Sequence, residues 1–193
     1  MTLFLTGLVI FFGLHFYSAV RSRAPEKDLK MRLGYGPFMG IYSLISLIGL
    51  VLIVYGFGGA RAAGVLYTPP TWMAHINLVL TLPAMILLVA SQVPAGRIKK
   101  ATKHPMLLAI KLWALGHLLA NGEINSVILF GSFLGFAIFD RIMVKRRGDL
   151  GPGDDVALKG SMDVVAIGVG VIVWAALAFW LHPILFGVVA VPA

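Results

Sequence analysis

Long apolar runs without charge are the feature that most limits what this chain can fold into. A stretch of 18 or more apolar residues is long enough to cross a bilayer as a helix, and the chain contains several, including the stretch from Val164 to Val188. With 59% hydrophobic and 12% charged residues, the chain is too apolar for a soluble domain, in which about half of the residues are apolar and about a quarter are charged. The sequence predicts an all-α, polytopic integral membrane helix bundle that forms a single domain over residues 1–193.

Six spans are predicted, with approximate bounds Leu3 to Val20, Tyr35 to Phe57, Trp72 to Gln92, Pro105 to Asn121, Asn125 to Val144, and Val164 to Val188. The first span is expected to be retained, because it has neither the positive n-region nor the clear cleavage site of a signal peptide. The sequence Gly56-Phe57-Gly58-Gly59 predicts a short link after the second span, and Pro69-Pro70 introduces the third.

Positive charges gather in alternate loops. If the loops alternate sides, fourteen Lys and Arg residues fall on one side and only Arg61 on the other. The positive-inside rule then places the basic side in the cytoplasm and both termini outside it. This rule accounts for the net charge of +8 without a nucleic-acid partner. The chain has no cysteine, which excludes disulfides, iron–sulfur clusters and thiol catalysis.

Histidines inside the spans are the candidate functional residues, because an ionisable group within a membrane costs about 2.5–3.5 kcal/mol on insertion scales. His15 lies roughly 7 Å inside the first span and His117 roughly 18 Å inside the fourth, at 1.5 Å per residue. His104 stands at the cytoplasmic end of the fourth span. His75 and His182 fall near the outer surface, where a histidine needs no functional role.

Helical geometry separates the two histidines of the fourth span. His104 and His117 differ by about 220° of rotation and roughly 20 Å of rise, so they cannot bind one metal ion together. His15, at an intermediate depth, is the better partner. Two buried imidazoles without cysteine suit haem iron, which needs one or two axial histidines and an apolar slot, better than zinc. The alternative is that each intramembrane histidine simply hydrogen-bonds a neighbouring helix.

Aromatic and basic residues could complete such a haem site. The aromatic residues are Phe11, Phe12, Phe16 and Tyr17 around His15, and Trp113 one turn before His117. Arg21, Lys103 and Lys111 are candidates to receive haem propionates, and Lys111 is able to snorkel towards the surface. Asp140-Arg141 is interpreted as a self-compensating pair, and Asp154, Asp155 and Asp163 as members of a solvated loop. No acid–base catalytic pair is evident.

Three stretches resemble a known family. They are His15-Phe16-Tyr17-Ser18-Ala19-Val20-Arg21 at the end of the first span, Gly34-Tyr35 before a Ser-rich second span, and the segment from Lys103 to Gly122. The third is similar to the pattern Arg-His-Pro…Leu-Trp…Ala-His-Leu…Asn-Gly of the NnrU family of bacterial membrane proteins, which is related to the plant and cyanobacterial 15-cis-zeta-carotene isomerase. The chain departs from this pattern with Lys103 for the usual Arg and Gly116 for the usual Ala.

The resemblance implies a b-type haem in the bacterial inner membrane. The histidines that match the ligand positions of the isomerase branch are His15 and His117, so they are the expected metal ligands. His104 would be a structural residue, or one that orients a propionate or a carbonyl. In the isomerase, haem iron is thought to change ligation with redox state and to promote cis–trans isomerisation of a polyene. The NnrU name links the other branch to nitrite and nitric oxide reduction. The implied partners are haem, membrane lipid, and an apolar polyene or nitric oxide.

Two further hypotheses stay open beside a haem-dependent isomerase or sensor. A basic-His-Pro motif at the mouth of a span also occurs in isoprenylcysteine-methyltransferase-like proteins, which would make the chain an S-adenosylmethionine-dependent membrane methyltransferase. The chain ends in an apolar helix rather than in the charged motifs of those enzymes. In the other hypothesis, it is a non-enzymatic accessory factor of a denitrification complex, and glycines such as Gly131 and Gly135 allow close helix packing.

Overall fold

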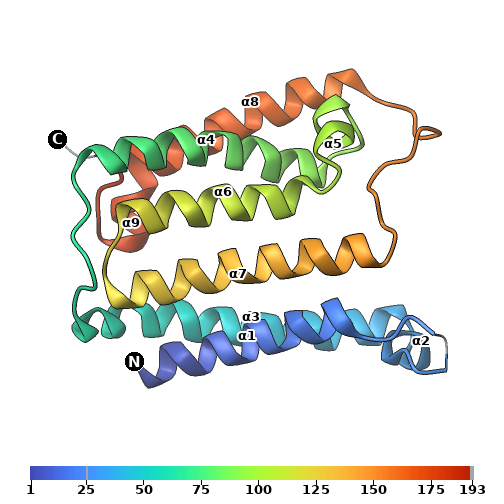
Figure 1. Cartoon of the computed structure of the whole chain (residues 1–193), viewed down its shortest axis with the longest axis horizontal. Helices are drawn as coiled ribbons and strands as arrows, with labels where there is room; N and C mark the ends of the chain where they lie inside the picture. The colour runs from blue at the N-terminus through green and yellow to red at the C-terminus, as the bar shows by residue number, and fades with distance from the viewer. Residues whose placement is uncertain (25, 192–193) are drawn as a thin grey trace. The chain divides into compact units, whose positions relative to one another are not determined.

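Two compact units make up the chain, of which the structure, a computed structural model, describes residues 1–24 and 26–191. Unit 1 comprises Met1–Gly64 and Glu123–Asn125, and unit 2 comprises Val65–Gly122 and Ser126–Ala193. Both units are helical (Figure 1). The single domain over residues 1–193 stays a prediction.

Five of the described helices are long and apolar enough to cross a membrane: Thr2–Val20, Tyr35–Ala63, Trp72–Gln92, Ile124–Arg146 and Gly160–Phe186. A sixth apolar helix, α6 (Pro105–Ala120), has 16 residues and a length of ~24 Å, against ~30 Å for the hydrocarbon core of a bilayer. The predicted class, an all-α polytopic membrane bundle with about six spans, is confirmed.

Unit 1 is built on the pairing of α1 (Thr2–Val20) with α3 (Tyr35–Ala60). The buried residues recur at helical spacing on both helices: Phe4, Leu8, Phe12, Phe38 and Ile53. Glycines bring the two backbones close, because a Cβ on Gly49 would lie 2.9 Å from the backbone nitrogen of Phe11. Small residues of this kind let membrane helices pack backbone against backbone.

The glycine-rich link predicted at 56–59 is wrong. Helix α3 continues through these residues to Ala60 and ends in the 3₁₀ turn Arg61–Ala63. The reason is tertiary, since Gly56 is buried against α1 and its lack of a side chain serves packing rather than a turn. Apolar burial of the surrounding residues outweighs the weak helix propensity of glycine.

We expect Gly56→Ala to destabilise the protein by about 1–3 kcal/mol, the range for overpacked sites. A Cβ there would lie 2.5 Å from the backbone nitrogen of Phe4 and 2.7 Å from its Cα, and helix backbone cannot move aside as a side chain can. Gly58→Ala is the matched control, because nothing lies within 4 Å of a Cβ at that position. Thermal unfolding in detergent measures both variants, and equal Tm values would contradict the close approach of α1 and α3.

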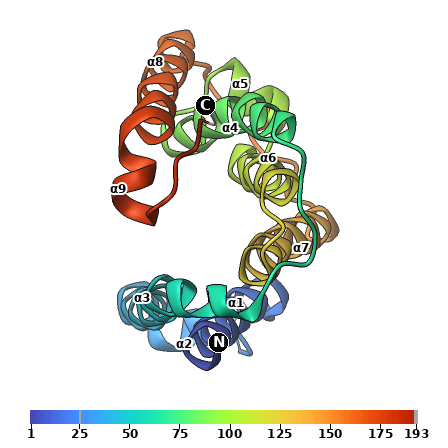
Figure 2. The same ribbon diagram turned by 90° about the vertical axis from the view of Figure 1, so that its left-hand side faces the viewer.

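Helix α4 (Trp72–Gln92) is central to unit 2, because both α6 and α8 (Gly160–Ala176) pack against it. Figure 2 shows α8, α4, α6 and α7 (Ile124–Arg146) following one another across this unit. The buried face of α4 is narrow and made of small or medium side chains, namely Asn77, Thr81, Ala84, Leu87 and Ala90. Helix α8 approaches it at Gly170, where a Cβ would lie 2.6 Å from the Cα of Ile86.

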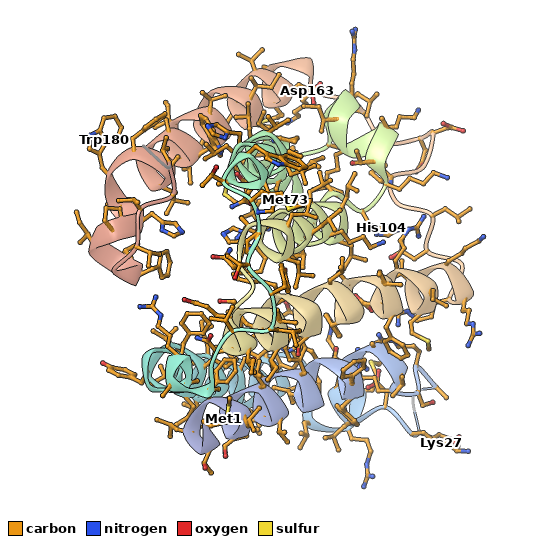
Figure 3. The ribbon with its side chains drawn as sticks, turned by 60° about the vertical axis from the view of Figure 1, so that its left-hand side comes forward. Met1, Lys27, Met73, His104, Asp163 and Trp180 are labelled. Carbon is orange, nitrogen blue, oxygen red and sulfur yellow. The ribbon has the colours of Figure 1, made fainter. Side chains whose placement is uncertain are left out.

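Two short helices were not predicted, α2 (Leu29–Leu33) in unit 1 and α5 (Arg97–Thr102) in unit 2. The first two amides of α5 donate to the carboxylate of Asp163 on α8, at 2.8 and 3.1 Å (Figure 3). The prediction that Asp163 belongs to a solvated loop is therefore wrong. It lies in the first turn of α8 and caps a helix that is distant in sequence, which satisfies amides that would otherwise be orphaned.

The last predicted span, Val164 to Val188, is interrupted near its end. Helix α8 stops at Ala176, and a π-helical turn, Leu177–Leu181, leads into α9 (His182–Phe186). Pro183 has no N–H to donate to the carbonyl four residues earlier, which breaks the regular ladder of hydrogen bonds at this point. The Nδ1–H of His182 donates to the carbonyl of Val188 at 2.9 Å.

Candidate functional site

His15 lies on α1 in unit 1, among aromatic rings. Its imidazole stacks on Phe11 with ring centroids 4.1 Å apart, and Tyr42 of α3 lies 5.5 Å away. Its Nδ1 is 2.7 Å from the carbonyl oxygen of Phe11. A carbonyl only accepts, so Nδ1 carries the hydrogen and, in the neutral ring, Nε2 carries the lone pair. This is the tautomer that binds metal through Nε2.

His117 repeats the same arrangement on α6 in unit 2. Its Nδ1–H donates to the carbonyl of Trp113 at 2.8 Å, which again leaves the lone pair on Nε2. The imidazole stacks on Phe130 of α7 at 4.5 Å, and Trp113 lies 5.2 Å away. Trp113 in turn makes an edge contact with Phe133 at 5.4 Å. The neighbourhood is apolar and aromatic, as the sequence predicted for Trp113.

The end of α6 is closed by polar groups just after His117. Asn121 caps the helix, because its backbone N–H and its side-chain amide both donate to the carbonyl of His117 at 2.9 Å. The hydroxyl of Tyr67, from the segment before α4, donates to the carbonyls of Leu118 and Asn121. The last carbonyls of a helix have no intrahelical partners, so these bonds fix the turn that carries His117.

Gly122, just after the end of α6, also bonds the segment before α4. Its carbonyl accepts from the backbone N–H groups of Leu66 at 2.7 Å and Tyr67 at 3.3 Å. A Cβ on Gly122 would overlap the carbonyl group of Tyr67. Glycine at the end of the Asn-Gly pair therefore has a structural reason. The chain segment at residues 66–67 lies directly against Gly122 and leaves no space for a side chain.

On the α4 side, α6 is held by Asn77. The Asn77 side chain is buried, and its Oδ1 has no hydrogen-bond partner among the described residues. A Cβ on Gly116 would lie 2.5 Å from this oxygen, so Oδ1 rests against the Cα of Gly116, the type of Cα–H contact seen at helix interfaces. One turn later Thr81 accepts from the indole N–H of Trp174 at 3.1 Å, which ties α8 to the same face of α4.

His104 lies directly before α6 and contacts the loop that follows α7 (Figure 3). Its Nε2–H donates to the carbonyl oxygen of Asp149 at 3.1 Å. Lys103 has φ 63° and ψ −56°, and the backbone N–H of His104 donates to the carbonyl of Thr102 at 2.7 Å. Lys103 is thus the centre of a strained γ-turn. Both residues shape the start of α6, and their role towards haem stays a prediction.

Arg21 closes the loop between α1 and α2. Its Nη1 donates to the carboxylate of Asp28, and the two side chains are only 8% and 6% exposed. This hydrogen bond holds the pKa of Asp28 below its usual range. The guanidinium also lies 5.4 Å from the ring centroid of Phe38. No pattern in the sequence indicated Asp28 as a partner, and the role of Arg21 towards a propionate stays a prediction.

The predicted site residues divide between the two units. Unit 1 holds His15 and Arg21, and unit 2 holds Lys103, His104, Lys111, Trp113 and His117. The pairing of His15 with His117 therefore stays a prediction. Among residues 1–24 and 26–191, no group of three or more His, Asp or Glu side chains could hold a metal ion. A haem iron asks for only one or two protein ligands, so the histidines present fit haem.

Sequence reasoning missed Asn77, Tyr67 and Asn121 as supports of His117. Asn77 and Thr81 stand four residues apart within an otherwise apolar run, and this spacing places two polar groups on one helix face. That pattern was the available signal. No sequence pattern indicated the role of Tyr67, because a single sequence does not show which helix end a tyrosine in a loop will contact.

The helices and the half-buried imidazoles define the class of this protein, a polytopic α-helical membrane protein with histidines set among aromatic rings. The chain belongs to the NnrU family, since the family model described as NnrU protein matches residues 3–190. No curated protein and no solved structure matches the chain.

Proposed function

We propose that this protein is a haem b-binding integral membrane protein, with His15 and His117 as axial ligands. One observation supports this above the others: both imidazoles donate Nδ1–H to the carbonyl four residues earlier on their helix. Such a bond orients the ring and raises the basicity of the other nitrogen, as it does for metal-bound histidines in general. Two histidines prepared in the same way, in apolar helices without cysteine, suit iron in a porphyrin.

Aromatic rings would supply the slot for the macrocycle. Phe11 stacks on His15, and Trp113 and Phe130 surround His117. Bound haem would supply a redox-active iron, to which a diatomic gas could bind once one of the two axial histidines leaves. Two activities agree with that chemistry, nitric-oxide-linked physiology and redox-controlled isomerisation of an apolar polyene, and both keep the partner within the lipid or the apolar interior.

The proposed location is the bacterial inner membrane, with both termini outside the cytoplasm. The support is the charge asymmetry of fourteen to one between the two sets of loops. The helices carry the same pattern, because α7 ends in Lys145 and Arg146 while the connection from α6 to α7 contains no basic residue. The methyltransferase alternative gains nothing from the structure, because His104 of the His-Pro motif is bonded to a loop carbonyl.

Absorbance of the purified protein after addition of haem tests the proposal. We expect a Soret band that is lost when His15→Ala and His117→Ala are combined, because the iron then has no axial imidazole. His75→Ala is the matched control, since this exposed histidine lies in the first turn of α4 and should leave the band unchanged. A protein without a Soret band, or a double variant with the wild-type spectrum, would refute haem ligation by these residues.

A further inference from the structure

The loop between α1 and α3 in unit 1 presents apolar and basic side chains together. Helix α2 lies in this loop (Figure 1), and its Leu29, Met31 and Leu33 side chains are exposed. The buried ion pair of Arg21 with Asp28 anchors the loop, and the Asp28 side chain also caps α2. The apolar side chains are therefore exposed from a segment that the fold holds in place.

Two membrane helices place this loop at the surface of the bilayer. It begins where α1 ends at Val20 and stops where α3 begins at Tyr35, and both helices are long and apolar enough to cross a membrane. The exposed ring of Tyr35 has its centroid 4.7 Å from the ammonium of Lys30. Because tyrosines are enriched at the membrane–water interface, this contact brings the charge of Lys30 to the level of the lipid headgroups.

The charges of the loop are mostly positive. Residues 21–34 contain five basic and two acidic side chains, so their net charge is +3. Lys27, Lys30 and Arg32 form no ion pair with the described part of the chain, and Lys27 lies at the edge of unit 1 (Figure 3). An anionic bilayer surface attracts each such cation by a factor of about five in affinity. The loop is therefore complementary to negatively charged lipid, in its charge as in its apolar side chains.

We propose that residues 27–33 bind the headgroups of anionic phospholipids. Leu29 and Leu33 are four residues apart and share one face of α2, and Lys30 and Arg32 lie on either side of that face, ~80° from its centre. The two leucines enter the boundary between headgroups and acyl chains, while the cations on both flanks reach the phosphates. This lipid binding is independent of haem.

A single fluorescent probe tests the proposal, because the chain has no cysteine of its own. The environment-sensitive dye NBD is attached to Leu33→Cys, and the protein is placed in lipid nanodiscs, which leave both membrane faces open to solvent. Spin-labelled phosphatidylcholine quenches the dye from the lipid, and iodide quenches it from the water. We expect the ratio of lipid to iodide quenching to be at least about fivefold higher with phosphatidylglycerol present than in phosphatidylcholine alone, the factor for a single cation.

Leu150→Cys with the same dye is the matched control. Leu150 is also exposed, but it lies in the loop at residues 147–159, which contains three acidic and two basic side chains. Its quenching ratio should not respond to phosphatidylglycerol. In the Leu33→Cys protein, the triple change Lys27→Gln/Lys30→Gln/Arg32→Gln should abolish the difference between the two lipid mixtures.

Two results with the three cations in place would overturn the proposal, and neither depends on the folding of the triple variant. If iodide quenches the Leu33 probe more than the lipid does in both membranes, the segment lies in water. If the ratios are equal in the two membranes, the segment does not recognise negative charge. A response of the Leu150 probe as large as that of the Leu33 probe, or a triple variant that keeps the response, would also refute the role of these cations.

Discussion

Replacement of Gly122 by alanine is expected to have the largest effect of any single change, a loss of at least about 3 kcal/mol of stability, the upper end of the range for overpacking. A Cβ at this position would overlap the carbonyl group of Tyr67, and neither backbone can yield without breaking the bonds from Leu66 and Tyr67 to the Gly122 carbonyl. The turn of α6 that carries His117 would lose its hydrogen bonds to the segment at residues 66–67. Haem binding should fall together with stability.

Thermal unfolding in detergent and haem titration measure this effect. Gly131→Ala is the control, because this glycine lies within α7 and nothing is found within 4 Å of a Cβ there. A second variant, Tyr67→Phe, removes only the hydroxyl that donates to Leu118 and Asn121, and should cost about 1 kcal/mol. If Gly122→Ala melts like Gly131→Ala, the contact between the chain at residues 66–67 and the end of α6 is not present in the protein.

The spans could be predicted because hydrophobicity over about twenty residues is a local property of the sequence. Trp72–Gln92 has the predicted bounds, and the start of α6 at Pro105 follows from the preference of proline for a first turn. The errors share a cause. Gly56 is helical because α1 covers it, and Asp163 is a cap because α5 comes to it from 66 residues away. Neither partner is visible in the local sequence.

The candidate site was also predictable only in part. The histidines stand out by residue type and depth alone, and Trp113 follows from helical spacing. Their supports depend on how helices pair, which a single sequence does not contain. Arg21 donates to Asp28, a partner that no pattern in the sequence indicated, and Asp140 neutralises Arg147 rather than its neighbour Arg141. A charged residue near the end of a helix has several possible partners, whereas an apolar run has one favourable environment, the membrane or the interior of the protein.

Gly116→Ala is the second change that should alter the surroundings of His117, and it can be tested through its partner. The family pattern has alanine before the histidine, whereas this chain has Gly116 beneath Asn77. A Cβ at 116 would lie 2.5 Å from Asn77 Oδ1. Because this oxygen ends a side chain that can rotate, the single variant should lose about 1 kcal/mol, the lower end of the range for overpacking. Because the contact lies next to His117, a forced rotation of α6 should also shift the Soret band of the haem-loaded protein.

Asn77→Ala should rescue Gly116→Ala. Without Oδ1 the nearest Asn77 atom to the new Cβ would be the Asn77 Cα at 3.4 Å, which is an ordinary contact. Thr81 bonds the backbone oxygen of Asn77 at 2.8 Å, so truncating the side chain leaves that bond in place. In a double-mutant cycle the two changes should therefore couple by about 0.5–3 kcal/mol, as contacting residues do. Additive losses of stability, with no recovery of the wild-type Soret position in the double variant, would show that Asn77 does not set the position of α6.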